Sequence, residues 1–334
     1  MRRIISFILL LSMIVICCSC GAKKAKNEPY SNSFRAFDTM CSYTIYDDLS
    51  KKDLEDIRKK IQSTCFDYDY AFDKYTPNSF VKKLNQNKHE IVDGDNLEIL
   101  KKSIEYSEKT DGAFDITISP LVDLWAINTN HFRVPREAQI LKLLPKVGYK
   151  QINIKGHTAH LAQLGSIDLG AIAKGFVADK LVKELKDMGV KSAIIDLGGN
   201  IYAIGSKEGK PFKVGINKPF GNGELSASVK VKDTSVITSG VYQRYKKQGD
   251  KIYSHIIDPK TGRPIDNDLN SVTVISKNAT AADALSTGLM VMGLDKGMKL
   301  ANKTENIEAV FIDKNNKLHL TDGLVQKGKE ITIK

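Results

Sequence analysis

The feature that most limits the fold of this chain is a succession of strand patterns with no helical pattern among them. These patterns occupy residues 192–197, 212–216, 225–237, 251–257 and 270–276. Helical patterns lie mainly before this region, and a further one follows at 279–292. Helices and strands are thus mixed without a regular βαβ alternation. The chain is therefore predicted to be α+β and not a doubly wound parallel sheet.

The start of the chain has the pattern of an export signal. Two arginines precede an almost wholly apolar run, and the stretch CCSCG follows at 17–21. The small Ser19 before Cys20 resembles the lipobox of bacterial lipoproteins, in which the cysteine becomes the lipidated first residue. We expect a signal peptide at 1–19 and lipidation at Cys20. Cleavage at Cys18 is an alternative, and so is an uncleaved anchor, although the apolar run is shorter than the roughly 20 residues that span a membrane.

The residues after the signal have no apolar period. Residues 20–33 are therefore interpreted as the lipidated cysteine and a flexible tether, followed by one folded domain at 34–334. This arrangement predicts a bacterial lipoprotein on the outer face of the cytoplasmic membrane or in the periplasm.

Charge and cysteine content narrow the classes of partner and site. The net charge of +11 suits an anionic partner, but export and scattered lysines without interleaved aromatic residues argue against nucleic acid. Beyond the first twenty residues only Cys41 and Cys65 remain, too few for a cysteine-based zinc site. One disulfide is an alternative for this pair, and two small buried side chains are expected.

The stretch SIDLGAIAKG at 166–175 is predicted to form a strand end, a turn and the opening of a helix. The first N–H groups of a helix attract anions, and Lys174 adds a full positive charge beside them. The stretch lacks the glycine spacing of a P-loop or a dinucleotide fold. An anion site is one interpretation, and a solvated lysine on a helix is the other.

The stretch ATAADALSTG at 279–288 places two oxygen-bearing side chains four residues apart. Asp283 and Thr287 therefore fall on one helix face, and small alanines let a ligand approach. A carboxylate, a hydroxyl and nearby carbonyls suit Mg²⁺. An ordinary helix with an exposed Asp283 is the alternative.

The stretch IYSHIIDPKTGR at 252–263 places a histidine at a strand end. Strand alternation predicts Tyr253, His255 and Ile257 on one face, just before a turn. Such a histidine can accept a proton near neutral pH, whereas an ordinary hydrogen-bonded histidine is the alternative.

These three stretches, in this order, resemble the ApbE family of flavin transferases. FDKYTPNS at 72–79 and GAFDITISPLVDLW at 112–125 are similar to the same family, so the resemblance covers nearly everything after residue 34. It implies the family's α+β fold, with mixed, mainly antiparallel sheets and packed helices. This chain departs from the family at Cys41 and Ala126, where glycine is usual.

The resemblance also implies the roles of individual residues. Positions that contact FAD in the family match Met40, Tyr75, Ala113, Phe114, Asp115, Asp168, Lys174 and Ile257. The Mg²⁺ positions match the carbonyls of Ala171 and Ser286, the carboxylate of Asp283 and the hydroxyl of Thr287, and His255 matches a histidine proposed for the chemistry.

The activity that the resemblance implies is Mg²⁺-dependent transfer of FMN from FAD to a threonine or serine hydroxyl, with release of AMP. The expected acceptor is an exported flavoprotein or a subunit of a membrane redox complex, modified at a Ser/Thr-Gly-Ala-Thr type segment. One alternative is an FAD diphosphatase that uses water at the same site. Another is a lipoprotein that only binds flavin or delivers a solute, which would not need the Mg²⁺ ligands.

Overall fold

The computed structural model describes residues 28–163 and 165–334. The predicted signal peptide, the lipidation site at Cys20 and the first part of the tether lie outside these residues. In the described ranges, no helix has the length and apolar character needed to cross a membrane. Cys41 and Cys65 are both buried free thiols, so the two do not form a disulfide here.

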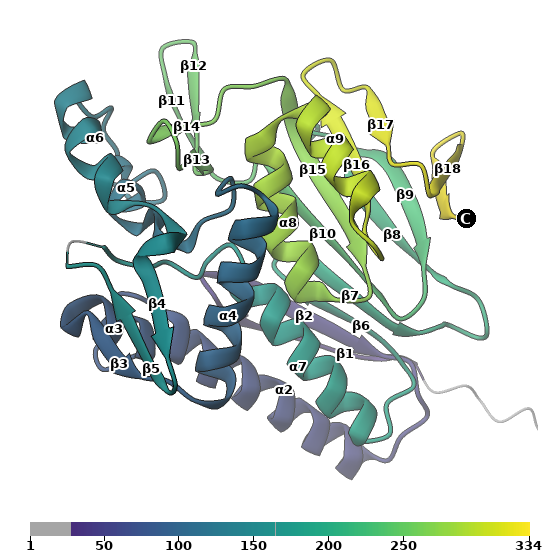
Figure 1. The fold of residues 1–334 in the computed structure, drawn as a ribbon. Coiled ribbons are helices and arrows are strands. Elements are labelled where there is room, and N and C mark those ends of the chain that lie inside the picture. Colours follow the sequence, from purple (N-terminus) through teal and green to yellow (C-terminus); the bar gives the residue numbers. More distant parts are fainter. Residues whose placement is uncertain (1–27, 164) are drawn as a thin grey trace, which may run out of the picture.

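A central sheet organises the molecule (Figure 1). Its eight strands follow the order β1-β2-β6-β7-β10-β15-β16-β17, and neighbouring strands are antiparallel. All residues of β15 are buried, which marks it as an interior strand. The strands are β1 (Tyr30–Ala36), β2 (Thr39–Ile45), β6 (Ser192–Leu197), β7 (Asn200–Gly205), β10 (Thr234–Gly240), β15 (Leu269–Ser276), β16 (Glu308–Asp313) and β17 (Leu318–Leu320).

A four-stranded sheet packs against one face of the central sheet. Its order is β18-β19-β9-β8, and β19 is parallel to β9. Apolar side chains of both sheets, among them Val214, Val236 and Val310, form one buried cluster. The strands are β8 (Phe212–Asn217), β9 (Leu225–Val231), β18 (Leu324–Lys327) and β19 (Glu330–Ile333).

Helices cover the other face of the central sheet (Figure 1). The central one, α8, is buried along almost its whole length because it is apolar nearly all round. It contacts β10 and β15 on one side and α7 and α4 on the other. The helices are α2 (Lys51–Phe72), α4 (Gly94–Lys109), α7 (Ala173–Asp187), α8 (Ala279–Met292) and α9 (Leu294–Lys303).

The remaining elements form a smaller part at the edge of the helical layer. A buried cluster that includes Leu121, Trp125 and Ile257 joins α5 and α6 to the segment after β12. The elements are α3 (Phe80–Asn87), β3 (His89–Ile91), η1 (Ile116–Ile118), α5 (Ser119–Trp125), α6 (Glu137–Leu143), η2 (Leu144–Lys146), η3 (Tyr149–Gln151), β4 (Ile152–Lys155), β5 (Thr158–Leu161), β11 (Tyr245–Gln248), β12 (Lys251–Ser254), β13 (Ile257–Asp258) and β14 (Arg263–Pro264).

The α+β prediction is confirmed, but several boundaries were wrong. The tether predicted to reach residue 33 ends before Tyr30, because the polar residues from there onward form the edge strand β1, whose Ser31 hydroxyl lies 2.9 Å from that of Thr44. The strand predicted at 225–237 is two strands, β9 and β10, separated by a turn in which Asp233 has a φ of 48°. The segment around Pro120, for which the interruption of an apolar run by proline predicts irregular structure, is instead helical, because this proline lies in the first turn of α5, where its missing N–H costs nothing.

The departure at Ala126 has a local explanation. This residue ends α5 in the left-handed conformation, with φ 49° and ψ 34°. Glycine adopts that conformation without steric cost, whereas an alanine there is strained by about 1 kcal/mol. The glycine that the ApbE family usually has at this position therefore fits the backbone observed.

Candidate functional site

A close contact between α7 and α8 positions Asp283. The Gly175 N–H at the start of α7 donates to Asp283 Oδ2 on α8 at 2.8 Å. A Cβ atom on Gly175 would lie 2.3 Å from the carbonyl oxygen of Ala279, so only glycine permits this contact. One turn further along α7, the Asp179 carboxylate accepts the Ala279 N–H at 2.8 Å and so caps α8. No local sequence pattern indicates this role of Asp179.

The side-chain atoms around Asp283 that could bind a metal ion are all oxygen atoms. Asp283 is 4% exposed, and in the described part of the chain its Oδ1 has no hydrogen-bond partner. The Ser239 hydroxyl lies 2.8 Å from that of Ser286 and 3.2 Å from that of Thr287. Among the described residues no group of three His, Cys, Asp or Glu side chains gathers in a metal-binding arrangement. A site built from one carboxylate, hydroxyls and carbonyls fits Mg²⁺ and does not fit soft metals.

The turn before α7 uses most of its own N–H groups. Gly170 N–H donates to Asp168 Oδ1 at 2.9 Å, while the N–H groups of Ile172 and Ala173 donate to the Leu169 carbonyl. The expectation of a turn with free N–H groups was therefore largely wrong, because an aspartate and a preceding carbonyl already satisfy them. What remains for an anion is the ammonium group of Lys174.

Lys174 is half-buried in the first turn of α7. It forms no ion pair with any carboxylate in residues 28–163 and 165–334. Its positive charge lies close enough to His255 to lower the pKa of that imidazole. Burial is the larger cause of that lowered pKa, and the charge of Lys174 adds to it.

His255 lies between two strands and not within one. The hydroxyl of the buried Ser254 accepts the Ile256 N–H at 3.2 Å, and this local turn ends β12. The predicted strand face of Tyr253, His255 and Ile257 was therefore wrong. Tyr253 and Ile257 pack in the cluster around Trp125, whereas His255 faces the backbone of Arg244.

The environment of His255 fixes its chemical form. Its Nδ1 lies 3.0 Å from the Arg244 carbonyl oxygen, which can only accept, so Nδ1 carries the proton and Nε2 has a free lone pair. Burial, together with the positive charges of Arg244 and Lys174, lowers the pKa of His255 from 6.5 to about 4. The imidazole is therefore neutral at physiological pH and able to accept a proton.

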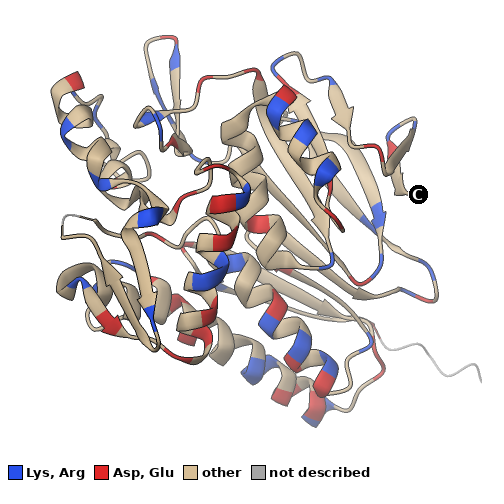
Figure 2. Ribbon diagram, in the orientation of Figure 1, with Lys and Arg blue, Asp and Glu red and all other residues tan. Residues whose placement is uncertain are grey.

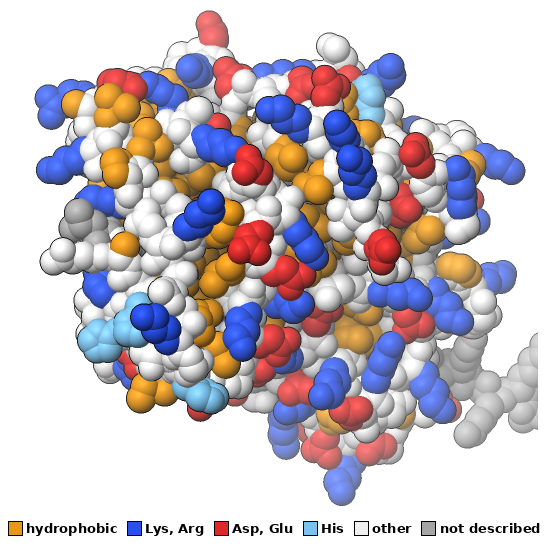
Figure 3. Space-filling model, viewed as in Figure 1, with side chains coloured by type: hydrophobic (Ala, Val, Ile, Leu, Met, Phe, Trp, Pro, Cys, Tyr) orange, Lys and Arg blue, Asp and Glu red, His pale blue; other side chains and the backbone are white. Residues whose placement is uncertain are grey.

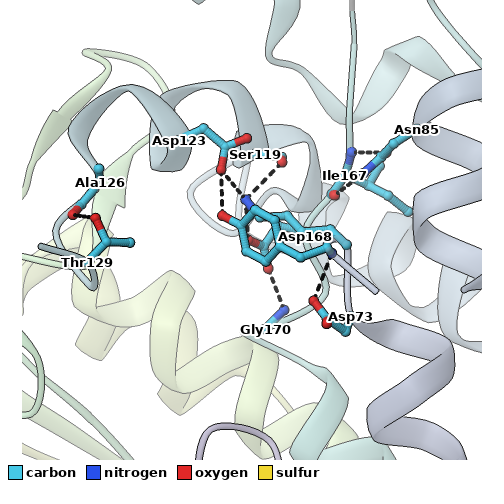
Figure 4. Close-up of polar contacts among 11 residues, drawn as sticks. Asp73, Asn85, Ser119, Asp123, Ala126, Thr129, Ile167, Asp168 and Gly170 are labelled. Atoms are coloured by element: carbon cyan, nitrogen blue, oxygen red, sulfur yellow. Dashed lines mark hydrogen bonds and ion pairs between the residues drawn. The ribbon is translucent and has the colours of Figure 1, made fainter. Parts of the chain in front are cut away.

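A buried lysine that the sequence did not reveal as a site residue connects two of the predicted FAD positions (Figure 4). Lys74 Nζ lies 3.0 Å from Asp168 Oδ2 and 2.7 Å from Asp123 Oδ1. The Tyr75 hydroxyl donates to the same Asp123 oxygen at 2.8 Å, and Lys74 also donates to the Ser119 hydroxyl. FDKYTPNS contains Lys74, but its partners are distant in sequence.

The segment at 113–115 lies beside Asp168. Ala113 and Phe114 are buried, and the Asp168 N–H donates to the Ile116 carbonyl at 2.7 Å. The Asp115 carboxylate accepts from the Thr117 backbone N–H at 2.8 Å, and burial raises its pKa. Its side chain is therefore committed to the protein's own groups. Of the other predicted FAD contacts, Met40 is 61% exposed on β2, and Ile257 is buried.

The chain resembles known proteins in both sequence and fold. The sequence pattern that defines the ApbE family matches residues 37–311. A curated FAD:protein FMN transferase of Treponema pallidum is 31% identical, with 94% of each chain covered, and one of Klebsiella pneumoniae is 38% identical, with 63% of this chain and 66% of the relative covered.

Solved structures agree with these sequence matches. The ApbE protein of Thermotoga maritima superposes with a TM-score of 0.81 at 28% identity, covering 88% of this chain and 97% of that one. The flavin transferase ApbE of Vibrio cholerae gives a TM-score of 0.80 at 29% identity, with the same coverage. The chain described here belongs to the ApbE family.

Proposed function

We propose that this chain transfers FMN from FAD to a hydroxyl group of an acceptor protein, with Mg²⁺ as cofactor and AMP as the second product. The observation that carries the proposal is the contact between α7 and α8. It holds the buried Asp283 carboxylate 2.8 Å from Gly175 N, one residue after Lys174, which has no ion-pair partner among the described residues. A carboxylate that would bind a cation, held by the residue that follows a lysine, suits a diphosphate substrate.

The proposed site residues would act in two ways, by neutralising the charge of the diphosphate and by positioning the reacting groups. Asp283, the Thr287 hydroxyl and the carbonyls of Ala171 and Ser286 would hold the metal. Mg²⁺ bound there would neutralise charge on the diphosphate and help to align the reacting groups. Lys174 would bind a diphosphate oxygen from the other side. Because phosphoryl transfer depends mainly on positioning and electrostatic stabilisation, this set is sufficient for the main catalytic task.

The chemical step is a substitution at the phosphorus of the FMN half. The oxygen of a threonine or serine hydroxyl of the acceptor bonds to this phosphorus, and the bond from phosphorus to the bridging oxygen breaks. AMP leaves with that oxygen, and FMN stays on the acceptor as a phosphoester. The Nε2 lone pair of His255 would take the hydroxyl proton, since Nδ1 is engaged with the Arg244 carbonyl.

The location and the acceptor complete the proposal. Export as a lipoprotein attached through Cys20 would place the enzyme on the outer face of the cytoplasmic membrane or in the periplasm. The acceptor there would be an exported flavoprotein or a subunit of a membrane redox complex. Positive and negative residues alternate along the ribbon in Figure 2, and their side chains intermingle over the face shown in Figure 3, so this face offers no broad basic surface for nucleic acid.

Intact mass spectrometry of an acceptor tests the proposed function. The protein is incubated with FAD, Mg²⁺ and an exported flavoprotein domain that contains a Ser/Thr-Gly-Ala-Thr segment. We expect the acceptor to gain the mass of FMN less water, and expect a chelator to prevent the gain. Free FMN and AMP beside an unmodified acceptor would support the diphosphatase alternative. FAD that stays bound and intact would support the flavin-binding alternative.

Replacement of His255 by asparagine tests the proton acceptor. Asparagine can still donate a hydrogen bond to the Arg244 carbonyl but cannot accept the proton. We expect the transfer rate to fall by about 10²–10⁴-fold with unchanged FAD affinity. Because the pKa of His255 is about 4, the His-dependent loss of wild-type activity should occur near pH 4 and not near 6.5. A full rate in the variant, or a histidine-dependent acid limb near pH 6.5, would contradict this role.

A further inference from the structure

A charged cleft is lined by residues that were not assigned to the FAD or metal sites. It has a volume of about 440 Å³. Three separate segments form its walls, namely the β1–β2 hairpin, the residues after α5 and the turn that enters β11. The residues that matter for its chemistry are Arg35, Asp38, Ile127, Asn128, Arg244 and Lys246. In Figure 1 the β11–β12 hairpin projects beyond the sheet near α5 and α6.

The cleft has an excess of positive charge. Arg35, Arg244 and Lys246 face a single acid, Asp38. None of the three cations forms an ion pair with a carboxylate in the described part of the chain, whereas lysines such as Lys180 and Lys186 do. Unpaired cations gathered from separate segments create a local positive potential that favours an anionic ligand.

Hydrogen bonds connect the cleft wall to His255, the proposed proton acceptor. The Arg244 carbonyl accepts the His255 backbone N–H at 3.0 Å and lies 3.0 Å from Nδ1 of the same residue. Tyr245, which also lines the cleft, packs its ring against Phe220, with ring centroids 5.8 Å apart. Arg244 therefore joins the cleft wall to His255 through hydrogen bonds, so a ligand bound along this wall would lie near the proposed proton acceptor.

We propose that this cleft binds an acidic segment of the acceptor protein and so brings its hydroxyl group to His255. The inference rests on the proposed function. FAD is the less suitable occupant, because Lys174 and the metal site already offer positive charge for its diphosphate. The cleft is also accessible to a large partner, since Arg35, Asn128 and Arg244 are all exposed. Charge complementarity would hold the segment in register while the hydroxyl reacts.

Two synthetic peptides provide the binding test. Both are fluorescein-labelled and contain one central threonine, and one has four aspartates around it where the other has four asparagines. Binding to the full-length protein is measured by fluorescence anisotropy at low salt, with FAD and Mg²⁺ present. We expect the aspartate peptide to bind about tenfold more tightly, and expect added salt to remove the difference because exposed charges are screened. Equal affinities at low salt would overturn the proposal.

A double variant locates the binding to the cleft. Arg35→Gln with Lys246→Gln removes two cations and leaves Arg244, whose carbonyl holds His255. The matched control is Lys247→Gln with Lys327→Gln, two exposed lysines without ion pairs among the residues described. We expect only the cleft variant to lose the tenfold preference, with unchanged FAD affinity. Weaker FAD binding in the cleft variant would assign the cleft to FAD and overturn the proposal.

The proposed transferase activity and the proposed docking site can be disproved independently of each other. Peptide binding requires no turnover, so a protein that prefers the aspartate peptide but never releases AMP would disprove the proposed transferase activity alone. Conversely, FMN transfer that proceeds with the same KM for the acceptor in the wild type and in the cleft variant would disprove the docking site alone.

Discussion

Replacing Asp283 by asparagine is expected to lower the rate of FMN transfer by about 10²–10³-fold, an effect comparable to the loss of one strong electrostatic contact to a transition state. Asparagine has nearly the same size, and its amide oxygen can still accept the Gly175 N–H that joins α7 to α8. The negative charge that would bind Mg²⁺ is lost. The variant should therefore remain folded while it needs a much higher Mg²⁺ concentration for activity.

A Mg²⁺ titration of the initial transfer rate measures this effect, and thermal unfolding monitors the fold. Asp187→Asn is the matched control, because Asp187 is an exposed aspartate at the far end of α7. The control should behave as the wild type in both measurements. If the Asp283 variant showed an unchanged Mg²⁺ dependence, the metal would have to bind elsewhere. If both its stability and its activity collapsed, Asp283 would be chiefly a structural link between the helices.

The placement of the candidate metal ligands on one face of α8 was predictable because the spacing of residues along a helix determines their geometry. Asp283 and Thr287 are four residues apart, and the strong apolar character of 279–292 left no doubt that they lie on one helix. Lys174 at a helix start was predictable for the same reason. The contact between the two helices was not predictable, because it depends on the absence of a side chain at Gly175 and on a tertiary approach to Ala279.

The orientation of His255 depended on a detail that strand periodicity cannot capture. The Ser254 side chain bonds back to the Ile256 N–H and interrupts the strand, so the residues that follow no longer alternate between two faces. Similarly, the polar residues from Tyr30 to Ser33 resemble a tether until their pairing with β2 is known. In both places hydrogen bonds determine the structure, although the residues that form them have no distinctive sequence pattern.

The buried lysine in FDKYTPNS shows most clearly what a sequence leaves undetermined. Lys74 is 49 residues away from Asp123 along the chain, and Asp168 is further still. No local pattern indicates that these three side chains meet. Burial by itself would lower the pKa of Lys74, but the two carboxylates outweigh it and raise the pKa above its ordinary value. Lys74 is therefore positively charged in the folded protein near neutral pH.

Replacing Lys74 by methionine should destabilise the fold and weaken FAD binding together. The side chain of Lys74 is only 8% exposed, so methionine fills its space but leaves Asp123 and Asp168 without their cation. Breaking a buried pair in this way costs about 3 kcal/mol, the lower end of the usual range, because Asp123 is half exposed. For a chain of this size the unfolding midpoint should fall by about 4 °C. Tyr75 and Asp168 would also lose the group that holds them together.

Two companion variants separate charge from packing. Lys74→Arg keeps the cation and should lose less stability than Lys74→Met, although a planar guanidinium cannot reproduce every contact of the ammonium group. Adding Asp123→Asn to Lys74→Met should recover part of the loss, because one uncompensated carboxylate is removed. Thermal unfolding and FAD titration of each protein provide the comparison.

The pH dependence of the same variants gives an independent check. A group whose pKa is raised by folding contributes stability at every pH below its unfolded pKa and loses it only as the pH rises through the folded value. The difference in unfolding free energy between the wild type and Lys74→Met should therefore stay constant from about pH 6 to about pH 9. A difference that disappears within that range would mean that Lys74 is not the charged centre of this network. A methionine variant that matched the wild type in both stability and FAD affinity would show that Asp168 and Tyr75 are positioned by their backbone contacts alone.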